Sequence, residues 1–340
     1  MKPTIGAFFL GLLALGFGAE AFAAEEVNVY SARKEELIKP MFDKFTAKTG
    51  IAVNFVTDEA DKLIARLKSE GANSPADVFL TVDIGRIARA REAGLLQPIR
   101  SELLEANIPA SLRDAQGYWF GLSKRARVIF YAFDRVSPEA LSSYEGLADE
   151  KWRGRICIRS SNNVYNQSLV ASLIAVHGIE ATEAWASALV GNFARDPAGG
   201  DTDQLRAVAA GECDIALANT YYYGRLMASD DPDDREVVER VGVFFPNQED
   251  RGVHVNVSGG GVTAAAPHRD NAVRLLEFLS SDAVQAMYAE VNHEFPVKPG
   301  IALSPIVAAW QGFREDDRNL GVLGELNAEA VRLMDRAGWQ

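Results

Sequence analysis

Short apolar runs alternate with helix-patterned segments along this chain, and that alternation constrains its fold more than any other feature. After the first run, Leu37, Met41 and Phe45 recur every four residues, which is the spacing of one face of a helix. Pro40 is compatible with a helix only in its first turn, so we expect this helix to begin at residue 36 or later. The first three apolar runs are residues 27–30, 51–56 and 77–82. Strand–helix alternation with short links predicts a doubly wound α/β fold.

The alternation starts again in the second half of the chain, with apolar runs at residues 127–131, 155–159 and 215–218. A chain of 340 residues is long enough for two domains, each with its own core. We therefore expect two doubly wound mixed sheets joined by extended hinge crossings, as in a clamshell. The predicted N-terminal lobe comprises residues 24–121 plus about 247–300, and the C-terminal lobe comprises residues 122–246 plus about 301–340.

The first 23 residues have the pattern of an export signal. Lys2 precedes an apolar stretch at 5–17, and small residues lead to Ala23. We expect residues 1–23 to be a signal peptide and the mature chain to begin near Ala24. The apolar stretch is too short for a good membrane span, and no later segment approaches the roughly 20 apolar residues that a span needs.

The overall charge limits the class of partner. The net charge is -12 at pH 7. Nucleic acids and anionic membranes require a basic patch that displaces counterions, so neither partner is expected.

Cys157 and Cys213 are the only cysteines, and both lie in apolar, strand-like runs. In an oxidising compartment such a pair can form a disulfide. Buried free thiols are the alternative, and we favour them because spacing along the chain does not show proximity in space. Two cysteines without a nearby histidine do not form a zinc site.

Three consecutive tyrosines, Tyr221, Tyr222 and Tyr223, follow the apolar run 215–218. The end of a strand, facing the crevice between layers, is where α/β folds bind ligands. A phenol has a pKa near 10, so neighbouring phenols ionise together at neutral pH only around a strong cation. Oxygen donors favour hard metals, and three phenolates balance a trivalent charge, which points to ferric iron. The alternative is that the three rings line an apolar cleft.

Five short motifs occur in one order over nearly the whole chain after residue 24. They are Ser-Pro-Ala-Asp-Val-Phe at 74–79, Lys-Arg-Ala-Arg-Val at 124–128, Tyr-Asn-Gln-Ser at 165–168, Asn-Thr-Tyr-Tyr at 219–222 and Asn-Val-Ser-Gly at 256–259. Together they resemble the ferric-iron-binding periplasmic proteins of bacterial ABC importers, in particular the tyrosine-rich type known from photosynthetic bacteria.

The resemblance implies a two-lobed, type II-like periplasmic binding protein. Such a protein captures ferric iron in the cleft between the lobes and delivers it to an ABC permease at the inner membrane. We accordingly expect a periplasmic monomer that catalyses no reaction.

The resemblance also implies which residues bind. It maps the metal-binding tyrosines of the family onto Tyr165, Tyr221 and Tyr222, whereas Tyr223 falls outside the pattern. It implies that Arg125 binds a synergistic anion such as carbonate or lies next to the ligands. We expect Arg33 and Arg225 to contribute positive charge to the same anion site.

The chain departs from the family after its first strand, where the tyrosine-rich type has His-Tyr and this sequence has Lys34 and Glu35. A protonated lysine cannot coordinate a cation, so Lys34 is excluded. Glu35 is a candidate carboxylate ligand, and the alternative is a solvated glutamate in the first turn of a helix. If the N-terminal lobe supplies no ligand, carbonate, citrate or water would complete the coordination.

Two other functions compete with iron binding. In the first, Arg33, Arg125 and Arg127 clamp a small organic or phosphorus-containing anion while the tyrosines line the cleft. In the second, the chain is a secreted hydrolase, but it lacks a recognisable pair of nucleophile and base.

Overall fold

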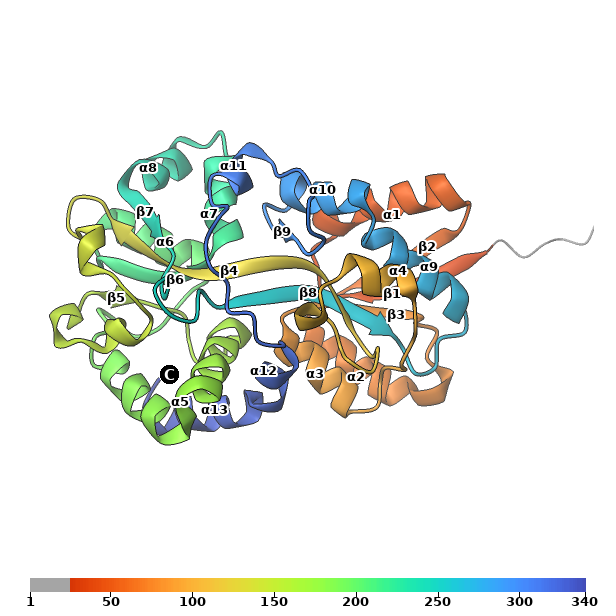
Figure 1. The fold of residues 1–340 in the computed structure, drawn as a ribbon, viewed down its shortest axis with the longest axis horizontal. Helices are drawn as coiled ribbons and strands as arrows, with labels where there is room; N and C mark the ends of the chain where they lie inside the picture. The colour runs from red at the N-terminus through yellow and green to blue at the C-terminus, as the bar shows by residue number, and fades with distance from the viewer. Residues whose placement is uncertain (1–24) are drawn as a thin grey trace, which may run out of the picture.

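The computed structural model describes residues 25–340, so the predicted signal peptide, residues 1–23, lies outside the described residues. Figure 1 shows two α/β lobes side by side, with the long strand β4 (Phe120–Ala132) running through both. The predicted two-lobed α/β architecture is confirmed. Within residues 25–340, no helix has both the length and the apolar character needed to cross a membrane.

The N-terminal lobe is built on a mixed sheet. Its strand order is β2-β1-β3-β8-β4, in which β1 is parallel to β2 and β3, and β8 is antiparallel to both of its neighbours. Gly260 shows why β8 is glycine-rich, since a Cβ there would lie 1.8 Å from the carbonyl oxygen of Phe79 on β3. The other strands of this lobe are β1 (Glu26–Ser31), β2 (Ala52–Thr57), β3 (Val78–Val82), β8 (Val255–Val262) and the short β9 (Phe295–Pro296), which pairs with β4.

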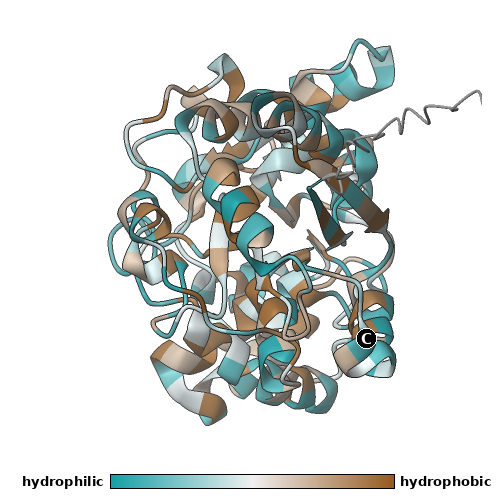
Figure 2. Cartoon of the chain, turned by 90° about the vertical axis from the view of Figure 1, so that its right-hand side faces the viewer, coloured by the Kyte–Doolittle hydropathy of each residue, from teal (hydrophilic) through white to brown (hydrophobic). Residues whose placement is uncertain are grey.

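Helices cover both faces of this sheet with their apolar sides inward. Figure 2 shows polar residues along the outward helix faces and apolar residues on the strands between them. These helices are α1 (Glu35–Thr49), α2 (Ala60–Glu70), α3 (Ile84–Glu92), α4 (Glu102–Asn107), α9 (Arg269–Leu279) and α10 (Asp282–Val291), with the 3-10 turns η1 (Gly71–Asn73) and η2 (Ala110–Leu112).

Helix α1 begins one residue earlier than predicted, at Glu35, so Pro40 lies in its second turn. The proline lacks the backbone N–H that would bond the preceding turn. Burial of Ile38, Met41 and Phe45 on one face of the helix outweighs that loss.

The C-terminal lobe has a smaller sheet in which β6 and β7 flank β4 and β5 is parallel to β6. Its strands are β5 (Ile156–Cys157), β6 (Ile215–Asn219) and β7 (Val241–Phe244). Its helices are α5 (Val164–Val190, kinked at Gly178), α6 (Asp201–Ala210), α7 (Thr220–Met227), α8 (Pro232–Arg240), α11 (Pro305–Ala308) and α13 (Asn327–Arg336), with the 3-10 turns η3 (Pro138–Ala140), η4 (Glu145–Ala148) and η5 (Glu150–Trp152).

The lobes meet within β4 itself. Ala126 still pairs with Val255 of β8, whereas the next residue, Arg127, pairs with Asn219 of β6. Helix α12 (Gly321–Glu325) packs on α3 of one lobe and on α5 of the other, which adds a second link. The residue ranges assigned to the lobes from the sequence stay predictions.

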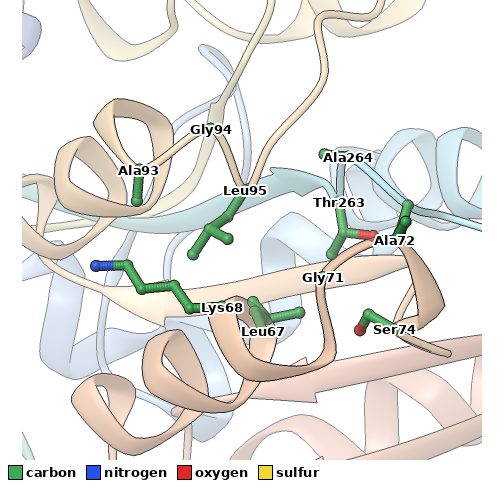
Figure 3. A pocket seen from close by; sticks show the side chains of 11 residues that line it. Leu67, Lys68, Gly71, Ala72, Ser74, Ala93, Gly94, Leu95, Thr263 and Ala264 are labelled. Carbon is green, nitrogen blue, oxygen red and sulfur yellow. The ribbon is translucent and has the colours of Figure 1, made fainter.

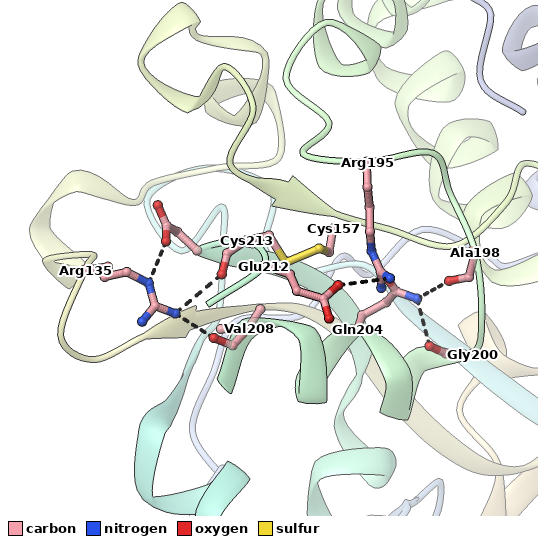
Figure 4. The surroundings of a disulfide bond; sticks show 10 residues. Arg135, Cys157, Arg195, Ala198, Gly200, Gln204, Val208, Glu212 and Cys213 are labelled. Carbon is pink, nitrogen blue, oxygen red and sulfur yellow. Dashed lines mark hydrogen bonds and ion pairs between the residues drawn. A yellow bond between two sulfur atoms is a disulfide. The ribbon is translucent and has the colours of Figure 1, made fainter. Parts of the chain in front are cut away.

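The two cysteines form a disulfide, Cys157–Cys213, shown in Figure 4. The preference for free thiols was wrong. Strands β5 and β6 are parallel neighbours, which brings the two Cα atoms to 5.8 Å although the cysteines are 56 positions apart in the sequence. The bond therefore ties β5 to the residue two positions before β6, and these two strands lead to the tyrosine-bearing helices α5 and α7.

Replacing both cysteines, as Cys157→Ala/Cys213→Ala, should lower the free energy of unfolding by about 2–4 kcal/mol, because the unfolded chain is no longer cross-linked. Urea unfolding of the oxidised protein and of the double variant measures the difference. Reduced wild-type protein should match the variant, and a loss below about 1 kcal/mol would contradict the assignment.

Candidate metal site

The predicted ligand tyrosines lie at the N-termini of two neighbouring helices. Tyr165 is in the first turn of α5, where the Asn163 side chain caps the helix by accepting a hydrogen bond from the Tyr165 backbone N–H at 3.1 Å. Tyr221 and Tyr222 are in the first turn of α7, directly after β6. Because β5 and β6 are parallel neighbours, their carboxyl ends share one edge of the sheet, and the helices that follow begin side by side.

The phenol groups converge at this edge. The Tyr221 hydroxyl donates a hydrogen bond to the Tyr165 hydroxyl at 3.1 Å. The rings of Tyr221 and Tyr222 lie 4.3 Å apart between centroids. The three residues thus form one cluster, although 56 positions separate Tyr165 from Tyr221.

Tyr223 points away from this cluster, into the interior of the lobe. Its hydroxyl donates a hydrogen bond to the Val241 carbonyl at 2.6 Å, and its ring packs on Phe130 at 5.2 Å. Its hydroxyl is therefore bound to the backbone and does not face the other phenols.

Three guanidinium groups cover the tyrosine rings. Arg125 and Arg159 lie 5.4 Å and 5.6 Å from the centroid of the Tyr165 ring, and Arg225 lies 5.0 Å from that of Tyr221. Arg125 and Arg225 were predicted from the sequence, whereas Arg159 was missed. The available signal was its position at the end of the apolar run 155–159, six residues before Tyr165.

Burial keeps the phenols of Tyr221 and Tyr222 protonated in this arrangement. It raises the pKa of Tyr221 well above its ordinary value, and the neighbouring phenols of Tyr165 and Tyr222 raise it further when they are charged, while Arg125 opposes them. Burial is also the largest cause of the raised pKa of Tyr222. Tyr221 and Tyr222 are therefore neutral near pH 7 unless a cation binds and favours the phenolates.

One buried carboxylate organises the residues beneath the tyrosines. Asp201, at the start of α6, pairs with Arg127 at 3.2 Å and with Arg159 at 3.5 Å. It also accepts a hydrogen bond from the backbone N–H of Asn219, two residues before Tyr221, at 2.9 Å. Arg127 in turn donates to Asn166, which follows Tyr165, at 2.6 Å. Arg127 therefore holds both tyrosine helices in place and is not free to clamp an anion.

Arg33, predicted to contribute to the anion site, is buried in the N-terminal lobe. Its guanidinium pairs with Glu294 at 2.9 Å and lies 5.5 Å from the Tyr288 ring centroid.

Glu35, the candidate ligand from the N-terminal lobe, is exposed at the first residue of α1. Within residues 25–340, no group of three or more His, Cys, Asp or Glu side chains is arranged to hold a metal ion. The tyrosine cluster thus remains the candidate metal site of the described chain.

A separate cavity of about 460 Å³ lies in the N-terminal lobe. Figure 3 shows it between the end of α2, at Leu67 and Gly71, and the end of α3, at Ala93 and Leu95. Lys68 is the only charged residue in its lining. None of the predicted site residues lines it, so we do not assign the cargo to this cavity.

A family model described as "Bacterial extracellular solute-binding protein" matches residues 40–315. The chain is a bacterial extracellular solute-binding protein. It is similar to iron uptake protein A1 of Synechocystis sp., with 54% identity over 93% of this chain and 88% of that protein. As a solute-binding protein, it is not an enzyme.

Solved structures of iron-binding proteins are similar to this chain in sequence and in fold. The structure of Trichodesmium IdiA (FutA) in complex with iron and citrate is 53% identical, with a TM-score of 0.90, over 93% of this chain and all of that one. The ferric binding protein from Campylobacter jejuni is 41% identical, with a TM-score of 0.88, over 92% of this chain and all of that one. The prediction of a type II-like periplasmic binding protein fold is confirmed.

Removing the buried carboxylate, as Asp201→Ala, should lower the free energy of unfolding of this solute-binding protein by about 3–5 kcal/mol, because Arg127 and Arg159 lose their shared partner. Urea unfolding is the measurement. Glu150→Ala, which removes an exposed ion pair with Arg153, is the matched control and should unfold like the wild type. Equal stability of the two variants would contradict the role given to Asp201.

Proposed function

We propose that this protein captures ferric iron between its lobes and delivers it to an ABC permease. The observation that carries the proposal is the convergence of Tyr165, Tyr221 and Tyr222, with two of the hydroxyls 3.1 Å apart at neighbouring helix N-termini. The names of the relatives support it, since one is an iron uptake protein and another is a ferric binding protein.

The three phenolates are the proposed ligands. Together they cancel the charge of a trivalent ion, and their hard oxygen donors match ferric iron better than copper or zinc. The N-termini of α5 and α7 add the positive ends of two helix dipoles, which favour the anionic form of tyrosines in the first turn.

An anion is proposed to accompany the metal. Arg225 and Arg125 lie over the rings of Tyr221 and Tyr165. Arg125 and Arg33 are themselves paired with Asp83 and Glu294, so Arg225 is the first candidate to attract a carboxylate or carbonate, as the iron and citrate complex of the Trichodesmium relative suggests. Glu35 stays a candidate ligand from the N-terminal lobe, provided that closure brings its exposed side chain to the metal.

The delivery steps are also part of the proposal. Residues 1–23 direct export to the periplasm, and the protein acts there as a monomer that docks on an inner-membrane permease. The small-anion alternative gains no support, because Arg127 is held by Asp201 and Asn166. The hydrolase alternative is excluded by the family.

Loading with ferric iron should produce an orange to red phenolate charge-transfer band, and Tyr221→Phe or Tyr222→Phe should weaken it, because one of the three phenolates is lost. Tyr223→Phe is the matched control and should keep the band, since Tyr223 is bonded to Val241 instead. The absorption spectrum of the chelator-stripped protein, titrated with a ferric complex, gives the answer. A colourless wild-type protein that retains no iron would overturn the proposal.

Iron binding should release protons and weaken on acidification. The phenols of Tyr221 and Tyr222 are neutral before loading, so each must lose one proton to the solvent when it binds the metal. Tyr222→Phe should release one proton fewer per bound iron than the wild type, as measured with a pH indicator in weak buffer. Affinity that stays constant as the pH is lowered from about 8 to about 6 would contradict phenolate ligation.

A further inference from the structure

Helix α7 touches the N-terminal lobe at a position that has no room for a side chain. Gly224 lies two residues after Tyr222 and faces His293, in the segment between α10 and β9. A Cβ at Gly224 would lie 2.7 Å from the His293 Cβ and 3.3 Å from the Trp310 ring. Carbon atoms that are not bonded to each other do not approach to 2.7 Å, so a larger residue at 224 requires His293 to move.

Helix α5 touches the same lobe through a hydrogen bond. The Ser168 hydroxyl, one turn after Tyr165, donates to Asp83 at 2.5 Å. The Asp83 carboxylate also accepts from the Gly85 backbone, and its own backbone N–H donates to Val257 of β8. Asp83 is therefore anchored in the N-terminal lobe, and Ser168 contacts it from the other lobe.

The two contacts share one arrangement. Each lies within one helical turn of a proposed ligand tyrosine, and each joins a helix of the C-terminal lobe to a fixed point of the N-terminal lobe. His293 is held because its neighbour Glu294 pairs with Arg33 and accepts a hydrogen bond from Ser123. The N-terminal lobe thus meets both tyrosine helices directly beside the metal site.

We propose that the contacts His293–Gly224 and Asp83–Ser168 define the closed, cargo-retaining position of the lobes, so that residue 224 must be glycine for the cleft to close. This inference deepens the proposed function and rests on it for the cargo. The two contacts determine how closely the lobes approach each other, and that separation can be measured without iron.

The test is a size-complementation experiment at residues 224 and 293. Gly224→Ala adds the Cβ that meets His293, and alanine favours the helix at this position. The same Cβ approaches the Trp310 ring to 3.3 Å, which a shift of a few tenths of an ångström relieves, so His293 is the main obstacle. Gly224→Ala/His293→Gly removes the opposing Cβ. Glycine suits position 293, whose φ is 55°. Gly191→Ala, in a helical backbone conformation at the end of α5, is the matched control.

Two readouts separate the inference from the proposed function. Far-red dyes on cysteines introduced at the exposed residues Lys44 and Arg153, one in each lobe, report the separation of the lobes with and without ferric citrate. The native cysteines are buried in their disulfide and do not compete for label. The rate at which bound iron passes to an added chelator reports retention.

Gly224→Ala should hold the lobes apart and release iron about 10-fold faster or more, while still forming the phenolate band. The double variant should regain the wild-type separation and rate, and Gly191→Ala should not differ from wild type. A wild-type separation in Gly224→Ala, or an open double variant, would overturn the inference. A wild-type protein that shows no phenolate band with ferric iron would instead contradict the proposed function. The inference would still be tested by comparing the separation of the lobes in Gly224→Ala and in the wild type.

Discussion

The buried carboxylate of Asp201 is the interaction on which the candidate site depends. It joins two arginines and the backbone at the end of β6, and through them it connects α5, α6 and α7. A charge inside a protein is stable only when it is paired and hydrogen-bonded, so these four groups must keep their relative positions. Because these groups contact the segments that carry Tyr165, Tyr221 and Tyr222, they also fix the relative positions of the tyrosines. The site is therefore positioned by the interior of one lobe before any cargo arrives.

Buried phenols are poor ligands until a cation enters, and that property suits a carrier. In the empty protein the raised pKa of Tyr221 favours the neutral hydroxyl, which hydrogen-bonds to Tyr165. A hard trivalent ion can offset the loss of several protons, whereas softer divalent ions gain less from phenolate oxygens. Under the proposed ligation by these tyrosines, burial and donor type together would discriminate between metals.

The sequence predicted those features that depend on neighbours along the chain. Strand–helix periodicity identified the two lobes, and the adjacent pair Tyr221 and Tyr222 stood out because nothing separates them. Tyr165 required the family resemblance, since only the parallel pairing of β5 and β6 brings it to the pair. The same pairing joins Cys157 to Cys213 and places Arg159 over Tyr165, and neither could be inferred from spacing. Long-range contacts are set by tertiary packing, which local patterns do not encode.

Strand β4 belongs to both sheets. It pairs with β8 of the N-terminal lobe up to Ala126 and with β6 of the C-terminal lobe from Arg127 onward. Arg125 therefore travels with the N-terminal lobe, while Arg127 stays with the C-terminal lobe, although a single residue separates them. When the lobes open, the Arg125 guanidinium should therefore move away from the Tyr165 ring. The ion pair between Arg127 and Asp201, which lies beneath the tyrosines, should stay in place. Opening would then expose one side of the proposed metal site while the tyrosine cluster keeps its geometry.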